Sequence, residues 1–310
     1  MTTIEAAAQA VRDTGGEVRA GGTDVMTRAP GTPVDLLGIP GLRGTDWRPD
    51  GSARIGALTP IADVLADERL AAAYPALAAT AAAIATPQIR NVATVGGNLL
   101  QRNRCWYLRN PAFTCHQTGG DTCPARDGAH LYSAVVDQGP CIAPHPSSLA
   151  VALLTYAATA DVHGRSPLRI AELYGDGGDP TRDHLLESGE ILQAVLMPAP
   201  APAERAAYRR ATAREMAEWP LVEAVARMTL DGGGVTSAAV AVGGVARTPL
   251  LLPEVADALL GRPATAENLA AAADLATARC SPLPRNAYKV ALLRATLIDT
   301  LTACLSPPSP

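Results

Sequence analysis

The chain has 310 residues, of which 48% are hydrophobic and 18% charged, and a formal net charge of −4. It is long enough for two domains with cores of their own, and it lacks the basic excess of proteins that bind nucleic acid or anionic membranes. The first residues have neither the basic start nor the apolar run of a signal peptide, and no stretch reaches the length of a membrane helix. We therefore expect the cysteines to be made in a reducing compartment, which favours metal ligation over disulfides.

Helices and short strands alternate in the N-terminal half. Apolar spacing, glycine stops and prolines at first-turn positions predict a helix over 4–14, strands over 17–20, 34–37 and 53–58, a helix that opens at 59–63 and an Ala-rich helix over 75–86. The strand over 17–20 and the helix over 75–86 each lead into a glycine turn.

The two glycine turns have the same form, a small residue, two glycines and then polar side chains. They are Ala20-Gly21-Gly22-Thr23-Asp24 and Thr94-Val95-Gly96-Gly97-Asn98. Glycine can adopt positive φ and aim successive N–H groups at an anion. Neither turn is the dinucleotide fingerprint G-x-G-x-x-G, but together the turns could hold one pyrophosphate from two sides. Ordinary strand-ending turns remain the alternative. Arg90, just before the second turn, could reach a phosphate or be solvated.

Four of the six cysteines lie in a loop-like stretch rich in glycine and proline. Cys105, Cys115, Cys123 and Cys141 have the spacing C-x9-C-x7-C-x17-C, without the C-x-x-C pair of zinc ribbons and zinc fingers. Thiols that only fill a core would not gather in such a loop. An iron–sulfur cluster tolerates this spacing. A zinc site, disulfides and unrelated thiols stay open as alternatives.

The second half of the chain predicts a separate C-terminal domain. We expect a helix over 148–156, strands over 158–163 and 190–197, a polar turn over 175–183 and a linker over 199–203. Beyond it, residues near 208–210 look strand-like, and period-two alternation over 222–230 predicts a strand paired through a glycine turn with 235–242. Helices over 253–261, 265–279 and 284–304 would pack on this sheet, with Cys304 facing the core.

The order of these motifs resembles a known family. Ala20 to Asp24, Ile89 to Asn98, Gly189-Glu190-Ile191-Leu192 and Tyr208-Arg209 together look like the FAD-binding medium subunit of molybdenum hydroxylases, the xanthine dehydrogenase and carbon monoxide dehydrogenase family. The stretches Gln101 to Tyr107 and Cys141 to Ser147 resemble the branch that adds a [4Fe-4S] cluster, as in periplasmic aldehyde oxidoreductases and 4-hydroxybenzoyl-CoA reductases.

The resemblance implies an α+β fold. Two subdomains of the vanillyl-alcohol-oxidase type (PCMH-like) would hold FAD between them, at 1–55 and 56–198, and the cysteine loop at 101–145 would be part of the second. A C-terminal domain with a small antiparallel sheet and helices would occupy 204–306.

Site residues are also implied, by position. The two glycine turns, with Thr94, Gly96, Gly97 and Asn98 in the second, would bind the pyrophosphate and ribityl part of FAD, and Arg90 would be nearby. Ile191 or Leu192 would lie against the isoalloxazine ring, with Arg209 near it, and the four loop cysteines would ligate the cluster. Ser148 stands where relatives usually have Asp, Arg209 stands where they often have Lys, and the chain starts without the strand that usually precedes the first helix.

The resemblance finally implies a role in electron transfer. We find no nucleophile–base pair or carboxylate dyad for substrate chemistry, so that chemistry would belong to a large molybdenum-cofactor subunit, with a small [2Fe-2S] subunit between. This chain would pass the electrons to an external acceptor. It would stay in the cytoplasm or be exported with a signal-bearing partner. A self-sufficient flavin oxidase or dehydrogenase, and a nucleotide-binding scaffold stapled by zinc, remain alternatives.

Overall fold

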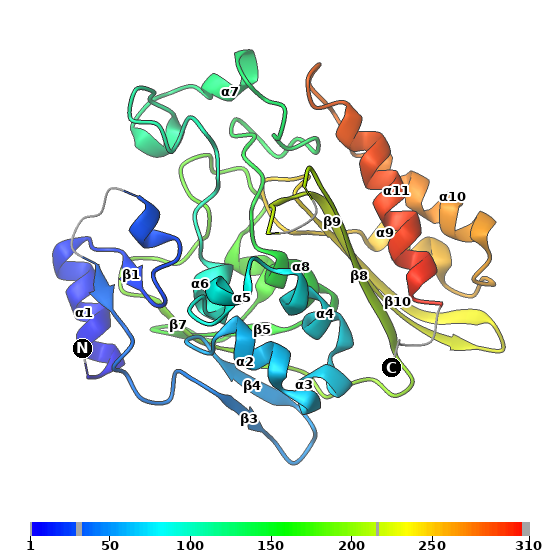
Figure 1. The fold of residues 1–310 in the computed structure, drawn as a ribbon, viewed down its shortest axis with the longest axis horizontal. Coiled ribbons are helices and arrows are strands. Elements are labelled where there is room, and N and C mark those ends of the chain that lie inside the picture. The colour runs from blue at the N-terminus through cyan, green and yellow to red at the C-terminus, as the bar shows by residue number, and fades with distance from the viewer. Residues whose placement is uncertain (1, 29–32, 215–216, 306–310) are drawn as a thin grey trace.

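The computed structural model describes residues 2–28, 33–214 and 217–305, so the predicted domain limits at residues 1 and 306 lie outside the described residues. The chain forms three sheets with helices packed on them, which confirms the α+β prediction (Figure 1). Within the described residues, no helix is both long and apolar enough to cross a lipid bilayer.

The N-terminal part is a helix packed beside a two-stranded parallel sheet. Helix α1 (Ile4–Thr14) begins where the Thr3 side chain accepts the Ala6 N–H, and it ends at Gly15 with φ +63°. It confirms the predicted helix. Strands β1 (Val18–Arg19) and β2 (Val34–Asp35) pair in parallel and are shorter than predicted. Between them lies the 3₁₀ helix η1 (Val25–Thr27).

The middle part is a five-stranded antiparallel sheet in the order β3-β4-β7-β5-β6. Its strands are β3 (Thr45–Trp47), β4 (Ala53–Gly56), β5 (Thr159–His163), β6 (Leu168–Arg169) and β7 (Ile191–Met197). The helices of this part are α2 (Ile61–Ala66), α3 (Glu68–Ala73), α4 (Pro75–Ala83), α5 (Pro87–Arg90), α6 (Val95–Leu99), α8 (Ser148–Thr155) and the 3₁₀ helix η3 (Ile170–Leu173). Strands β3 and β4 share the sheet of β7, so the chain before residue 56 contributes to this part as well.

The C-terminal part is a four-stranded antiparallel sheet in the order β11-β10-β9-β8, covered by helices on one face (Figure 1). Its elements are β8 (Arg205–Thr212), β9 (Pro220–Asp231), β10 (Gly234–Gly243), β11 (Leu250–Leu251), α9 (Pro253–Leu259), α10 (Ala266–Thr277) and α11 (Tyr288–Ala303). The predicted hairpin is confirmed.

The two faces of this sheet contact different cores. Tyr208 and Val225 pack into the core of the middle part, whereas Ala207, Ala224 and Met228 pack against the C-terminal helices. Neighbouring residues of a strand point to opposite faces, so the two sets alternate along β8 and β9. The sheet therefore joins both parts of the molecule.

Residues 101–145 form a mostly irregular projection, here called the cysteine lobe, with the short helices η2 (His116–Thr118) and α7 (Pro124–Asp127). Figure 1 shows it above the middle part, at the end of the C-terminal sheet. The segment 280–289 closes its base: the Ser281 N–H donates to the Val135 carbonyl at 2.7 Å, and the Asn286 side chain donates to the Ala134 carbonyl at 2.9 Å.

Candidate functional site

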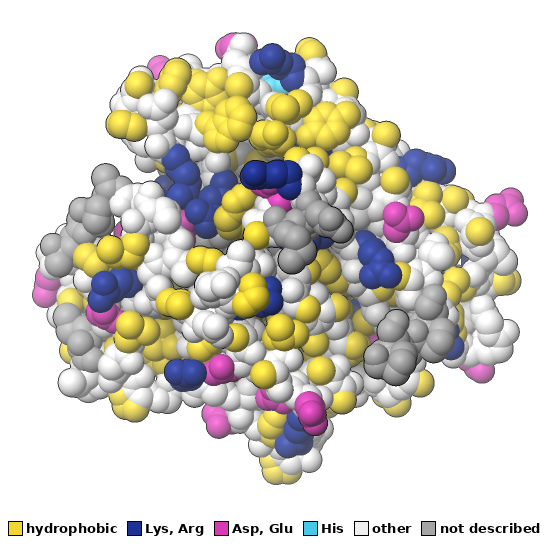
Figure 2. Space-filling view, in the orientation of Figure 1, with side chains coloured by type: hydrophobic (Ala, Val, Ile, Leu, Met, Phe, Trp, Pro, Cys, Tyr) yellow, Lys and Arg dark blue, Asp and Glu magenta, His cyan; other side chains and the backbone are white. Residues whose placement is uncertain are grey.

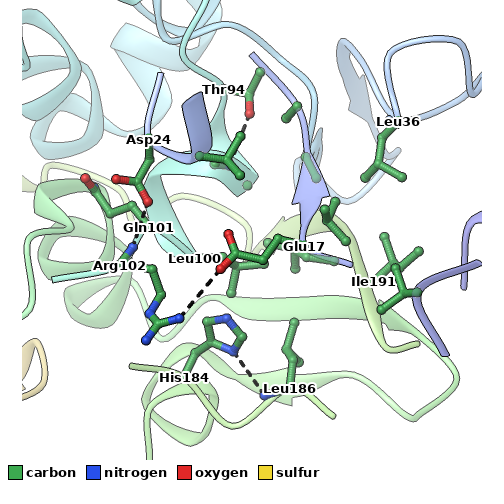
Figure 3. A pocket seen from close by; sticks show the side chains of 18 of the residues that line it. Glu17, Asp24, Leu36, Thr94, Leu100, Gln101, Arg102, His184, Leu186 and Ile191 are labelled. Carbon is green, nitrogen blue, oxygen red and sulfur yellow. Dashed lines mark hydrogen bonds and ion pairs between the residues drawn. The ribbon is translucent and has the colours of Figure 1, made fainter. Parts of the chain in front are cut away.

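The first glycine turn presents open backbone donors to a cavity. Gly22 has φ +76°, a conformation that favours glycine. Within the described residues, the N–H groups of Gly21, Gly22, Thr23 and Asp24 have no protein acceptor. The turn and the neighbouring Ala20 line a cavity of about 360 Å³, the first cavity (Figure 3). Successive free N–H groups of this kind are suited to an anion.

The second glycine turn is a helix start, which corrects the prediction of positive φ. Gly96 and Gly97 lie inside α6, and the Thr94 side chain accepts the Gly97 N–H at 3.1 Å. The Gly96 N–H already donates to the Ala57 carbonyl at 2.8 Å. A Cβ on Gly96 would lie 2.9 Å from the Ala57 Cβ, so this glycine permits close packing. Its N–H is not available to a ligand.

The two turns nevertheless lie together. A Cβ placed on Gly21 would be 1.8 Å from the Val92 carbonyl oxygen, so the first turn packs directly on the backbone that leads into α6. Thr94, Gly96 and Gly97 line the first cavity with Gly21. The fold thus brings the two glycine turns to one site, and the free N–H groups there belong to the first turn.

Asp24 is held by arginines instead of facing the cavity as a free acceptor. Its carboxylate accepts the Arg102 N–H at 3.0 Å and an Arg109 guanidinium N–H at 2.9 Å, and it pairs with Arg104 at 3.2 Å. Burial alone would raise the pKa of Asp24, but these hydrogen bonds and charges lower it below its usual range. Asp24 therefore anchors the cysteine lobe to the first turn.

Several residues of the first cavity were not predicted as site residues. Arg28 and Arg102 bring positive charge to the wall, where Glu17 pairs with both. Figure 3 shows His184 beside Arg102 and Glu17. Burial lowers the pKa of His184 to about 4, so the imidazole is neutral at pH 7. These residues come from loops far apart in the sequence, and no local pattern marks them.

The far end of the first cavity is apolar. Ile191 and Leu192 line it together with Leu36 and Leu58. Ile191 is 2% exposed and belongs to the core around α1, so one of its sides packs on that helix core. The predicted pair is therefore in the cavity wall.

A second cavity of about 220 Å³ shares Thr23, Asp24, Gly97 and Gln101 with the first. Ser148, Asn98 and Trp219 are among its other lining residues. Ser148 and the pair of Ile191 and Leu192 therefore lie in different cavities, on either side of the glycine turns.

Asn98 and Ser148 connect the second cavity to buried polar groups. The Asn98 side-chain oxygen accepts the Ser147 hydroxyl at 2.7 Å, which fixes the start of α8. Ser148 lies beside Glu223, whose carboxylate accepts the Tyr208 hydroxyl at 2.8 Å. Burial raises the pKa of Glu223 above its usual range, although the hydrogen bonds from Ser148 and Tyr208 oppose this.

The structure puts Arg210, not Arg209, in the wall of the second cavity. Arg210 pairs with Glu223 in the sheet register and shares the sheet face of Tyr208. Arg209 points to the opposite face, toward the layer of C-terminal helices, and is exposed. Arg209, the predicted site residue, therefore lines neither the first nor the second cavity.

Arg90 has a structural role in this fold. Its guanidinium donates to the carbonyl oxygens of Ala82, Ile84 and Ala85 at 3.3, 2.9 and 3.1 Å. Ala82 is in the last turn of α4 and the other two residues follow its end, where helix acceptors lack partners. Arg90 lines neither cavity, so its predicted approach to a phosphate does not match its placement.

The four loop cysteines line one small cavity of about 20 Å³, the cysteine cavity, with Asn103 and Gln117 in its wall. The nearby Cys141 lowers the pKa of the Cys123 thiol to about 5. Across the described ranges, His, Cys, Asp and Glu side chains form no group of three or more with the spacing of a metal-ion site. Cys280 lies outside this cavity, and Cys304 is 1% exposed in the C-terminal core, as predicted.

Known proteins share this sequence and fold. Residues 2–200 match the family described as the FAD binding domain in molybdopterin dehydrogenase, and residues 206–304 match the CO dehydrogenase flavoprotein C-terminal domain. The chain is 35% identical over 313 residues to the aldehyde oxidoreductase FAD-binding subunit PaoB of Escherichia coli K12, which covers 97% of this chain and 95% of the relative.

Solved structures show the same fold. Carbon monoxide dehydrogenase from Hydrogenophaga pseudoflava matches with a TM-score of 0.76 at 24% identity, over 98% of this chain and 95% of that chain. Quinoline 2-oxidoreductase from Pseudomonas putida 86 matches with a TM-score of 0.75 at 20% identity, over the same shares of the two chains. With the family match over residues 2–200 and the relative at 35% identity, the chain belongs to the FAD-binding medium subunits of the molybdenum hydroxylase family.

Proposed function

We propose that this chain is the FAD and [4Fe-4S] electron-transfer subunit of a molybdenum-cofactor oxidoreductase. The observation that carries the proposal is the row of free N–H groups from Gly21 to Asp24 on the wall of the first cavity. The pyrophosphate of FAD needs such donors. Arg102 and the hydroxyl of Thr94, in the same wall, would add a positive charge and a further hydrogen bond.

The two ends of FAD would lie in the two cavities on either side of the glycine turns. Arg104 and Arg210 line the second cavity, and positive charge near a flavin favours its reduced, anionic form. We therefore assign the isoalloxazine ring to the second cavity, near Ser148. The adenine would lie in the first cavity, against the apolar side chains of Ile191 and Leu192, in place of the ring contact that the sequence suggests.

The four loop cysteines would hold the cluster. They line a common cavity although up to 35 positions separate them in the sequence, and Cys280 and Cys304 lie elsewhere. Four thiolates are the ligand set of a [4Fe-4S] cluster. When bound, the cluster would supply one-electron transfer next to a flavin that takes up two electrons. The chain's own residues would fix the thiols: the Cys105 N–H donates to the Asn103 side chain at 3.0 Å.

The substrate reaction would take place on partner subunits. The 35% identical relative is an aldehyde oxidoreductase subunit, and a structural neighbour is a quinoline oxidoreductase. We therefore propose a large molybdenum-cofactor subunit that oxidises aldehydes or hydroxylates aromatic heterocycles, a small [2Fe-2S] subunit and an external acceptor. The complex would be cytoplasmic, or exported with a partner that carries the signal.

The test is the absorption spectrum and the iron, sulfide, zinc and molybdenum content of the complex purified with its partners. We expect a flavin band over broad iron–sulfur absorbance. The matched variants are Cys141→Ser, which should lose the iron of this subunit and keep flavin, and Cys280→Ser, which should keep both. A complex without flavin contradicts the FAD assignment, and zinc without iron in the isolated chain contradicts the cluster.

A further inference from the structure

A larger cavity of about 590 Å³ lies between the cysteine lobe and the ends of β8 and β9. We call it the lobe–sheet cavity. Its wall contains aromatic side chains from both sides: Trp106, Tyr107 and Tyr132 from the lobe, and Trp219 from the residue just before β9. Its volume falls in the range of about 300–1,000 Å³ that small-molecule sites have. Figure 2 shows hydrophobic side chains gathered over the lobe and arginines in the hollow below it.

This cavity adjoins both proposed redox sites. Cys105 and Tyr107 line it and also line the cysteine cavity. Arg104, Trp219 and three further residues line it and also line the second cavity, to which the flavin ring was assigned. A ligand in the lobe–sheet cavity would therefore be separated from each redox group by a shared layer of side chains.

The aromatic rings of the wall are arranged to receive another ring. Trp106 and Tyr132 meet edge to face with centroids 5.5 Å apart, and the Arg104 guanidinium lies 4.3 Å from the centroid of Trp219. Trp106 is 59% exposed and Tyr132 42%, so both have free ring surface. Electron-rich indole and phenol rings stack well on an electron-poor planar ring.

The polar groups of the wall provide hydrogen-bond donors. Arg104 Nε and His145 Nε2 have no partner within the described residues, whereas the carboxylate of Glu218 is already paired with Arg214. His145 Nδ1 accepts the Ser147 N–H at 3.2 Å, so the neutral imidazole carries its proton on Nε2. Both nitrogens are covered by neighbouring atoms, so a ligand would contact them only if these side chains move. An excess of donors favours a ligand with carbonyl oxygens.

We propose that the lobe–sheet cavity binds a quinone, which is the external electron acceptor of this subunit. The inference rests on the proposed function, because it requires reduced FAD in the second cavity. The balance is two electrons and two protons: reduced FAD returns to FAD and the quinone becomes the hydroquinone. The aromatic walls hold the quinone ring, and the donors of the wall bind its carbonyl oxygens.

The experiment is anaerobic stopped-flow reoxidation of the flavin in the photoreduced complex. The probe is 2-methyl-1,4-naphthoquinone, and ferricyanide, a small hydrophilic anion, serves as the comparison oxidant. We expect the rate to saturate with the quinone. Trp106→Ala should raise the half-saturating concentration about tenfold through the lost ring contact. Ala213→Trp places a large side chain in the cavity just after the end of β8. It should raise the half-saturating quinone concentration at least tenfold as well.

Trp47→Phe is the matched control, because Trp47 stacks on Tyr74 in the middle part, away from this cavity. This control should behave as the wild type, and ferricyanide should reoxidise all four proteins at rates within about twofold of one another. A rate linear in quinone, or one unaffected by both cavity variants, overturns the inference while flavin is present. Wild-type complex without flavin would instead contradict the proposed function.

Discussion

The carboxylate of Asp183 and the guanidinium of Arg247 form a fully buried ion pair at 2.5 Å, with side chains 0% and 2% exposed. Asp183 also accepts the Asn103 N–H at 3.1 Å and a Gln117 side-chain N–H at 3.0 Å, both from the cysteine lobe. Burial alone would raise the pKa of Asp183, but the charge of Arg247 and the hydrogen bonds hold it well below its usual range. One carboxylate thus joins the lobe to both other parts.

Asp183→Asn should destabilise the protein strongly. Arg247 would remain buried without its charge partner, which costs about 3–5 kcal/mol. Urea unfolding at pH 7 measures the loss, and limited proteolysis should cut first within residues 101–145. Asp179→Asn is the control, since Asp179 is exposed and bonds only to Thr181 nearby. Equal stability of the two variants would show that the ion pair does not hold the lobe.

Gly21→Ala should remove FAD from the chain. The added Cβ would meet the Val92 carbonyl oxygen, so the first turn must move away from the start of α6, at a cost of about 1–3 kcal/mol. We expect flavin content well below that of the wild type, measured from absorbance after denaturation. Gly234→Ala is the control, because its Cβ would have its nearest neighbour at 3.4 Å. Full flavin content in Gly21→Ala would count against the assigned pyrophosphate site.

The flavin potential should distinguish Arg210 from Arg209. Arg210→Met removes a positive charge from the second cavity, so the two-electron midpoint potential should fall by about 30 mV or more, which corresponds to ~1.4 kcal/mol. Arg209→Met removes the same charge from the opposite face of β8 and should change the potential much less. Spectroelectrochemical titration of both variants makes the comparison. A larger effect from Arg209 would place the ring elsewhere.

The buried Lys289 should make the free energy of unfolding depend on pH. Its ammonium group donates to the Ser133 carbonyl at 3.1 Å, and burial lowers its pKa to about 7. The unfolded chain keeps this lysine charged up to about pH 10.4, so between those values the unfolded state binds more protons and stability rises with pH.

The Lys289→Met variant lacks this titration. The unfolding free energy of the wild type minus that of the variant should therefore increase between pH 7 and 9, by up to about 1.4 kcal/mol per pH unit. Urea unfolding of both proteins at pH 7, 8 and 9 measures it. A difference that stays flat would mean that the three carbonyls around the amine keep it charged in the folded state.

Local patterns predicted much of the fold. The alternation over 222–230 became β9, and the helix over 4–14 ends at the predicted glycine. These elements could be predicted because the spacing of apolar side chains and the glycine that ends a helix are local features of the sequence. The grouping of the four cysteines in one cavity also followed from their place in a single loop.

Predictions failed where a distant partner decides the role of a residue. The second glycine turn looks like the first, but the Ala57 carbonyl takes the N–H of Gly96, and the pattern gives no sign of Ala57. Arg209 and Arg210 occupy opposite faces of β8, and only Arg210 lines the second cavity, which the local pattern does not reveal. Asp183 and Arg247 are 64 positions apart, so nothing local pairs them.

The closure of the cysteine lobe by the segment 280–289 determines when the lobe can form during synthesis. Among the described residues, the carbonyls of residues 133–135 accept hydrogen bonds from Ser281, Asn286 and Lys289, which are made more than 130 residues later. Until residues 281–289 have been made, the base of the lobe lacks these hydrogen bonds, and the segment that closes it is absent. A lobe whose base closes this late would also receive the proposed cluster late in the synthesis of the chain.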